Sequence, residues 1–192
     1  MTWQRRAAAS GMSPLPPRRK WRAILLASLT LAPAYWSLLM GMVAAATDTA
    51  EPEPSAAPLI AFGLAVVPFV FVVLAFLSEH PRAPGAVVWA MLLTLAIGIP
   101  VSALAADAVT GLLAGVGAGG IVALRRDTDH TWKARAIAVL MISVWAFLTV
   151  RVTPEVVLVL GPALPFTSIG VADQLSERAR ERDASRHEGA PS

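Results

Sequence analysis

Long apolar runs alternate with short charged segments along the chain, and this alternation predicts an all-α membrane protein. The run 86–124 dominates the pattern, because its 39 residues carry one ionisable side chain, Asp107. As one straight helix the run would be ~58 Å long at ~1.5 Å per residue, about twice the ~30 Å hydrocarbon core of a bilayer. We therefore expect it to fold back at Asp107, downstream of Pro100, and to form two spans.

The whole pattern predicts a polytopic helical bundle of six transmembrane spans. Each span is an apolar run of about 17–24 residues between polar or charged residues. The expected spans are residues 23–46, 58–77, 86–106, 108–124, 134–150 and 154–172. This membrane domain, 23–172, follows a basic arm, 1–22, which is expected to be disordered. A charged tail, 173–192, follows it and is expected to begin as a helix.

Capping residues and helix breakers refine these limits. Asp107 is expected to cap the fourth span by accepting hydrogen bonds from free backbone amides. Thr153 is expected to cap the sixth, with Pro154 at the first helical position and Glu155 in the first turn. Proline and glycine mark possible helix breaks at Pro68, Pro100, Gly161, Pro162 and Pro165.

The start of the chain admits a second interpretation. Ala44-Ala45-Ala46 before Thr47-Asp48 resembles a signal-peptidase site behind a basic region and an apolar region. The apolar region has ~24 residues, however, whereas that of a signal peptide has about 7 to 15. We therefore favour an uncleaved first span and leave cleavage of residues 1–46 as the alternative.

Lys and Arg are distributed unevenly between the two sides of this arrangement. With a cytoplasmic N-terminus, fifteen of the sixteen fall in cytoplasmic segments and Arg151 alone falls outside. The positive-inside rule therefore favours six spans with both termini cytoplasmic. Basic residues next to the spans are expected to contact lipid headgroups of the bilayer. They are Arg18, Arg19, Lys20, Arg22, Arg125 and Arg126.

Composition supports the membrane class. Of the 192 residues 56% are hydrophobic and 15% charged, and the mean hydropathy is +0.62, too apolar for a soluble domain of this size. The net charge of +3 does not indicate nucleic-acid binding, because the basic residues flank apolar runs without interleaved aromatics. Arg outnumbers Lys fourteen to two and Ala is abundant, which is typical of a GC-rich bacterial genome and points to the plasma (inner) membrane.

Glycines of the fourth span suggest two motifs. Gly115 to Gly120 match Gly-x-Gly-x-x-Gly, but a dinucleotide site needs a strand, a turn and a helix, and this match lies within an apolar span. Gly111, Gly115 and Gly119 instead recur every four residues and form one bare helix face. We expect this face to pack on another helix, of the same chain or of a second protein or copy.

No catalytic or cofactor-binding constellation is evident. The absence of cysteine excludes disulfides, thiolate metal sites and cysteine nucleophiles. His80, His130 and His187 all fall in expected cytoplasmic segments, away from membrane depth. Asp127 and Asp129 beside His130 could bind a divalent metal, although a solvated charged loop is the favoured interpretation. We therefore predict no metal, no cofactor and no catalytic residue.

Three functions remain open. The leading hypothesis is a non-catalytic accessory or assembly subunit that contacts another membrane protein or a second copy, because the Gly face suits helix packing. The alternative is a small transporter, suggested by helix breakers in the third and sixth spans. Its substrate would be neutral or lipid-like, because no charged residue lies deep in a span. A membrane-embedded enzyme is the third possibility.

Overall fold

The fold is given by a computed structural model in which residues 15–47, 56–125 and 132–188 are described. These residues form seven helices, and no strand occurs among them. The helices are α2 (Pro17–Thr47), α3 (Ala56–Leu77), α4 (Ala83–Ala105), α5 (Ala108–Ala123), α6 (Trp132–Val152), α7 (Pro154–Leu160) and α8 (Leu164–Glu188). The predicted all-α fold is confirmed.

Several of these helices are long and apolar enough to cross a membrane. Four of them, α2, α3, α4 and α6, meet this criterion over most of their length. The pair α7 and α8 makes a fifth candidate if it is counted as one broken span, since the two are bent by 94° at a short break. The apolar helix α5 is shorter, with 16 residues. By length and composition the described chain therefore has four to five candidate spans, which is consistent with a helical membrane bundle.

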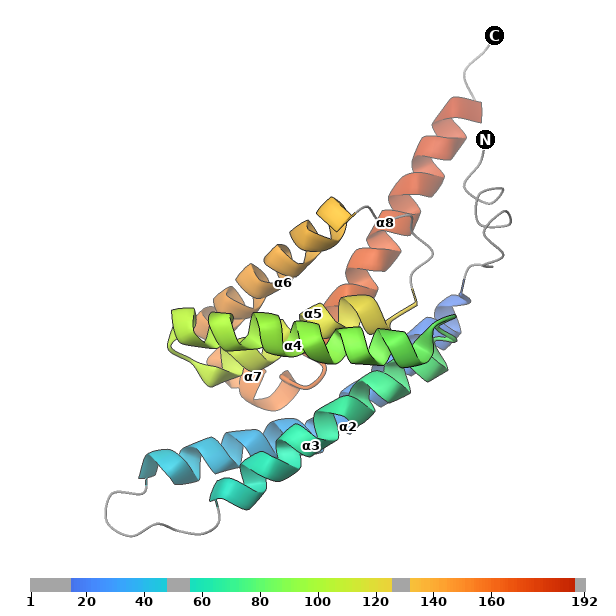
Figure 1. The fold of residues 1–192 in the computed structure, drawn as a ribbon. Coiled ribbons are helices and arrows are strands. Elements are labelled where there is room, and N and C mark those ends of the chain that lie inside the picture. The colour runs from blue at the N-terminus through green and yellow to red at the C-terminus, as the bar shows by residue number, and fades with distance from the viewer. Residues whose placement is uncertain (1–14, 48–55, 126–131, 189–192) are drawn as a thin grey trace.

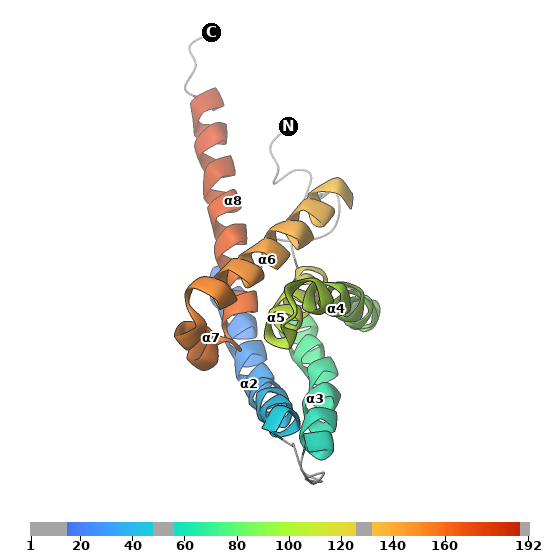
Figure 2. The same cartoon turned by 90° about the vertical axis from the view of Figure 1, so that its left-hand side faces the viewer.

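Helix α5 is the centre of the bundle. It packs most extensively on α4, and it also contacts α3, α6 and α8. Nearly all its side chains are buried, from Thr110 to Ala123. Helices α2 and α3 form a second antiparallel hairpin beside it. The first part of α8 lies against the start of α2, and the rest of α8 extends beyond the other helices (Figures 1 and 2). The glycine-rich sequence of α5 allows four helices to approach it.

Two helix limits differ from those expected. Helix α2 begins at Pro17, so the basic residues from Arg18 to Arg22 are helical and not part of a disordered arm. Proline fits a first helical position because no intrahelical acceptor awaits its missing N–H there. Helix α8 continues to Glu188, so most of the expected tail is one helix with the last span. Between the first two expected spans, residues 48–55 of the segment 47–57 lie outside the described residues, as do the basic arm before residue 15 and the last four residues.

The breaks fall at only some of the expected positions. Pro68 and Pro100 lie inside α3 and α4, which continue through them. Gly161 and Pro162 do lie in the turn that separates α7 from α8, and Pro165 lies in the first turn of α8.

The two predicted caps have different outcomes. The long apolar run reverses at Ala106, whose φ of 50° is left-handed, and at Asp107. Asp107 caps α5 as predicted, accepting from the N–H groups of Val109 at 3.1 Å and Thr110 at 3.0 Å. Thr153 holds the N-cap position of α7, with Pro154 at its start and Glu155 in its first turn as predicted. The Thr153 hydroxyl, however, donates to the Thr149 carbonyl at 3.0 Å and makes no side-chain cap hydrogen bond.

Candidate functional site

The site is built on the close contact between α4 and α5. A Cβ atom at Gly111 would lie 2.6 Å from the Gly98 carbonyl oxygen, and one at Gly115 would lie 2.5 Å from that of Thr94. The Thr94 hydroxyl also donates to the Gly115 carbonyl at 3.2 Å. The backbones therefore touch, which only glycine permits. The structure places this Gly face against α4 of the same chain.

Other faces of α5 hold the remaining helices. Gly119, the last glycine of the Gly face, lies between two helices: a Cβ there would lie 2.7 Å from the Ala90 carbonyl oxygen of α4 and 2.6 Å from the Phe71 ring of α3. A Cβ at Gly117 would meet Ile142 of α6 at 2.5 Å. On a further side, Gly120 lies against Phe166 of α8. The four-residue spacing predicts packing at Gly111, Gly115 and Gly119, but it misses Gly117 and Gly120. The high density of glycine between residues 115 and 120 was the sequence signal that could have indicated them.

A groove of about 730 Å³ lies between α4 and α6, with α5 as its floor. Residues from Trp89 to Val101 on α4 and from Arg135 to Ser143 on α6 line it, together with Ile121 and Val122 of α5. The lining is apolar apart from Arg135, Ser143 and the indole N–H of Trp89, and the Ser143 hydroxyl already donates to the Val139 carbonyl at 2.9 Å. Volume and lining are those of a small-molecule site.

Beyond one end of the groove, α4 and α6 meet. There the guanidinium of Arg151, in the last turn of α6, donates to the Ala105 carbonyl of α4 at 3.1 Å. Ala105 ends α4, so its carbonyl lacks an intrahelical partner and accepts this bond. The same guanidinium lies 5.5 Å from the centre of the Phe147 ring. From this junction α4 and α6 diverge toward their N-terminal ends (Figure 1).

The open end of the groove is basic. Arg135 is exposed there, and Arg125 follows α5 on the same side. His80 lies in the turn between α3 and α4. Its pKa is lowered mainly by burial and further by the positive charges of Arg125 and Arg135. Its Nδ1 accepts from the Arg82 N–H at 3.1 Å, as a neutral imidazole can. A neutral histidine between arginines leaves this end positively charged.

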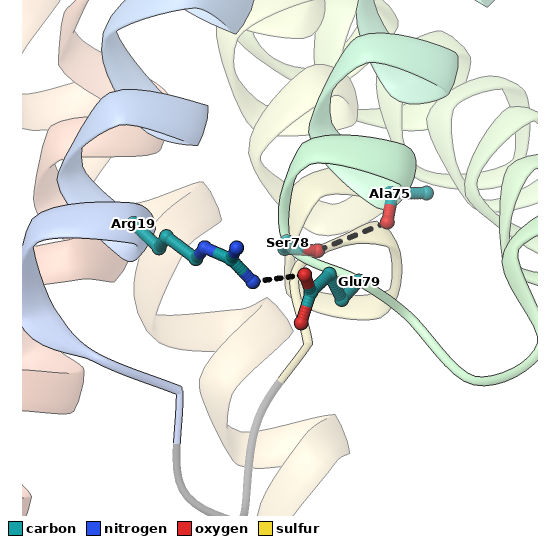
Figure 3. Close-up of polar contacts among 4 residues, drawn as sticks. All are labelled: Arg19, Ala75, Ser78 and Glu79. Carbon is teal, nitrogen blue, oxygen red and sulfur yellow. Dashed lines mark hydrogen bonds and ion pairs between the residues drawn. The ribbon is translucent and has the colours of Figure 1, made fainter.

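Hydrogen bonds and an ion pair fasten the neighbouring helix ends. Arg19 of α2 pairs with Glu79 after α3, and both side chains are about half exposed (Figure 3). The buried Ser78 hydroxyl donates to the Ala75 carbonyl at 3.2 Å and accepts from the Arg125 N–H at 3.2 Å. These contacts hold the ends of α2, α3 and α5 together.

The ammonium of Lys20 lies 2.8 Å from the Asp173 carboxylate, and the two side chains are 6% and 4% exposed. Lys20 therefore fastens α8 to α2 and is not at the headgroup surface expected for it. Arg18, Arg19 and Arg22 are exposed, as headgroup contact requires, and Arg125 is partly buried. Arg126 lies outside the described residues.

The break between α7 and α8 is enclosed by protein. Gly161 and Pro162 are buried, and a Cβ at Gly161 would lie 2.5 Å from the Tyr35 ring of α2. The Tyr35 hydroxyl donates to the Val157 carbonyl at 2.8 Å. Irregular backbone among apolar helices is tolerated where protein covers it in this way.

Within the described ranges, no three His, Cys, Asp or Glu side chains lie close enough together to hold a metal ion. Of the candidates considered for such a site, Asp127, Asp129 and His130 fall outside those ranges. The groove is thus the most defined candidate site of the described chain.

The architecture defines the class as a helical membrane bundle with a lateral groove. Comparisons with protein-family models, with curated proteins and with solved structures find no match to this chain. Its function must therefore be argued from its own residues.

Proposed function

We propose that this chain is a small, non-catalytic transporter that takes a lipid-like molecule laterally from the bilayer into the α4–α6 groove. The groove is the observation that carries the proposal. The groove is accessible from outside the bundle, because two of the residues that line it, Trp89 and Leu140, are each 63% exposed. A ligand that enters from the bilayer stays in an apolar medium, so only apolar or amphiphilic molecules suit the lining.

Two features favour movement of the ligand over static binding. First, α4 is almost wholly exposed on its outer side and depends on α5 for most of its packing. Second, α7 and α8 form an interrupted helix whose α8 part packs on α5 at Gly117 and Gly120, and interrupted helices commonly line substrate pathways in transporters. Because α4 and α6 are joined at Arg151 and Ala105 and diverge from there, the groove between them can widen or narrow with little disruption of the core.

The proposal includes six crossings, with both termini cytoplasmic and the chain in the plasma membrane. Successive helices alternate in direction, and α7 with α8 would form one broken span (Figure 1). The 16 residues of α5 extend ~24 Å, at the short end for a span. Described basic residues gather where α2, α4 and α6 begin, which favours that end as cytoplasmic.

The chain lacks cysteine, so single cysteines test this arrangement without background. Gly85→Cys and Ala108→Cys place a thiol at opposite ends of the α4–α5 hairpin, and Ser192→Cys marks the C-terminus. A membrane-impermeant maleimide on intact cells should label only Ala108→Cys. Equal labelling of Gly85→Cys and Ala108→Cys would show that the hairpin does not cross twice.

Transport is tested in vesicles that contain the purified chain and a fluorescent phospholipid, with an impermeant quencher that reads movement between leaflets. Ala96 lines the groove, so Ala96→Trp should fill part of it. Loss of contact with about two methylene groups, at ~0.8 kcal/mol each, should slow transfer about tenfold. Ala103→Trp is the matched control, because Ala103 is exposed on α4 outside the groove.

Wild-type protein and Ala103→Trp should both move the phospholipid faster than protein-free vesicles do. If the wild-type chain adds nothing to the spontaneous rate, the transport proposal is refuted. If Ala96→Trp and Ala103→Trp are equally fast, the groove is not the route.

An accessory or assembly subunit is the second candidate, and α8 favours it. This helix of 25 residues extends well beyond the other helices, anchored at Asp173, and its projecting half offers a surface for another membrane protein or a second copy (Figure 2). Purification in mild detergent with a C-terminal tag tests it: a stoichiometric partner would favour this function, and recovery alone would favour transport.

A further inference from the structure

We propose that the molecule in the groove is an anionic phospholipid whose headgroup phosphate lies at Arg135 while one acyl chain runs along α4 toward Pro100. This inference rests on the groove of the proposed function and adds the class of its substrate. It starts from the uneven distribution of polarity along the groove, which is apolar over its length and cationic at its open end.

The length of the groove suits an acyl chain. From Trp89 to Val101 the α4 wall covers twelve residue steps, or ~18 Å at ~1.5 Å per residue. This is more than half the ~30 Å thickness of a hydrocarbon core, and therefore exceeds the depth of one leaflet. On the opposite side, α4 and α6 meet at Arg151 and Ala105, beyond the groove. One acyl chain can thus be held along its length, with its headgroup at the basic end.

Charge decides the class of headgroup. Two acidic side chains packed at this end are engaged elsewhere: Glu79 pairs with Arg19 and Asp173 pairs with Lys20. Among the described residues, Arg135 makes no ion pair, and its exposed guanidinium borders the groove. A guanidinium binds phosphate through paired N–H donors. The positive charge of Arg135 at the groove favours a headgroup that carries a net negative charge over a zwitterionic one.

Trp89 adds a second contact at the same end. Its ring lines the groove near the start of α4 and carries one N–H donor. Tryptophan is enriched at the membrane interface because its ring is apolar and its N–H is polar. The pair of Trp89 and Arg135 therefore places the boundary between acyl chain and headgroup at this level of the groove.

The test measures which phospholipid the purified full chain retains from vesicles of equimolar phosphatidylglycerol and phosphatidylcholine with identical acyl chains. Retained lipids are counted by mass spectrometry after exchange into detergent. Wild-type protein should be enriched in phosphatidylglycerol, and Arg135→Gln should reduce the enrichment about fivefold. Arg135→Lys, which keeps the charge, should retain most of it. Arg178→Gln is the matched control, since Arg178 is an exposed cation of α8 outside the groove and outside the set of expected headgroup contacts.

The outcomes separate this inference from the function on which it rests. If Arg135→Gln keeps the wild-type enrichment, or if Arg178→Gln loses as much, the headgroup site at Arg135 is refuted although the groove can still bind lipid. Loss of both lipids in Ala96→Trp, with Ala103→Trp unchanged, supports the groove itself. A wild-type chain that retains no phospholipid and migrates as a dimer would place a second copy there and overturn both.

Discussion

The ion pair between Lys20 and Asp173 gives the sharpest prediction about stability. The two groups are 153 residues apart in the sequence, their atoms are 2.8 Å apart, and their side chains are nearly inaccessible. They join the start of α2 to the middle of α8, beside the contact of Gly170 with Ile24 and Trp21. Removal of either partner would take this ion pair away from a charge that stays buried.

The expected magnitude follows from this burial. Breaking a buried pair on one side costs ~3–5 kcal/mol, because the remaining ion is poorly solvated. The neighbouring pair of Arg19 and Glu79 is the internal control, since its side chains are 57% and 52% exposed. Exposed pairs contribute about 0–1 kcal/mol. Lys20→Met and Asp173→Leu should therefore each destabilise the chain severely, whereas Glu79→Gln should change little.

The assay is reversible unfolding of the purified chain in mixed micelles with increasing denaturing detergent, followed by tryptophan fluorescence. Trp21 lies next to the pair and reports on this contact. The double variant Lys20→Met/Asp173→Leu buries no charge and should recover most of the stability that each single variant loses. Single variants within ~1 kcal/mol of wild type, or a double variant as unstable as the singles, would refute this reasoning.

Three further predictions concern other parts of the bundle. Gly115→Leu should prevent folding, because even its Cβ would overlap the Thr94 carbonyl, whereas Gly85→Leu, with nothing within 4 Å, should migrate in gel filtration like wild type. The pKa of His80 is held below its ordinary value of 6.5 by burial and two arginines, so the unfolded chain binds the proton first as pH falls. Unfolding titrations should therefore show stability falling as pH decreases below about 6.5, and His80→Gln should flatten that decline. Arg151→Met should lower stability by ~1.5–3 kcal/mol in the same titration, since the Ala105 carbonyl loses a charged donor; an unchanged midpoint would rule out that junction.

Local features could be predicted from the sequence. Asp107 is the one ionisable residue of the 39-residue run 86–124, and it marks the reversal of the chain. At a helix start its carboxylate accepts hydrogen bonds from backbone amides, whereas in the membrane interior it would have no such donors. The close contact at Gly111 and Gly115 follows from their spacing, although the sequence does not say which helix fills it. Pro68 and Pro100 lie within continuous helices, since neighbouring contacts compensate for the lost hydrogen bond.

Features made by distant segments could not be predicted. The groove exists because α4 and α6 meet at Ala105 and Arg151 and then diverge, which depends on packing against α5 on both sides. Arg135 looks like an ordinary flanking cation until α6 is placed beside α4. The sequence around Lys20 likewise predicts a headgroup contact, and its ion pair with Asp173 depends on the packing of α8 against α2.

Photo-crosslinking tests the central claim, that a lipid occupies the α4–α6 groove, most directly. The purified chain would be loaded with a phospholipid that carries a diazirine on its acyl chain, freed of bulk lipid, irradiated and mapped by peptide mass spectrometry. The account predicts adducts on the walls from Trp89 to Val101 and from Arg135 to Ser143, which disappear in Ala96→Trp. Adducts spread over all exposed apolar helices, including the outer face of α3 at Phe62 and Phe69, would contradict it.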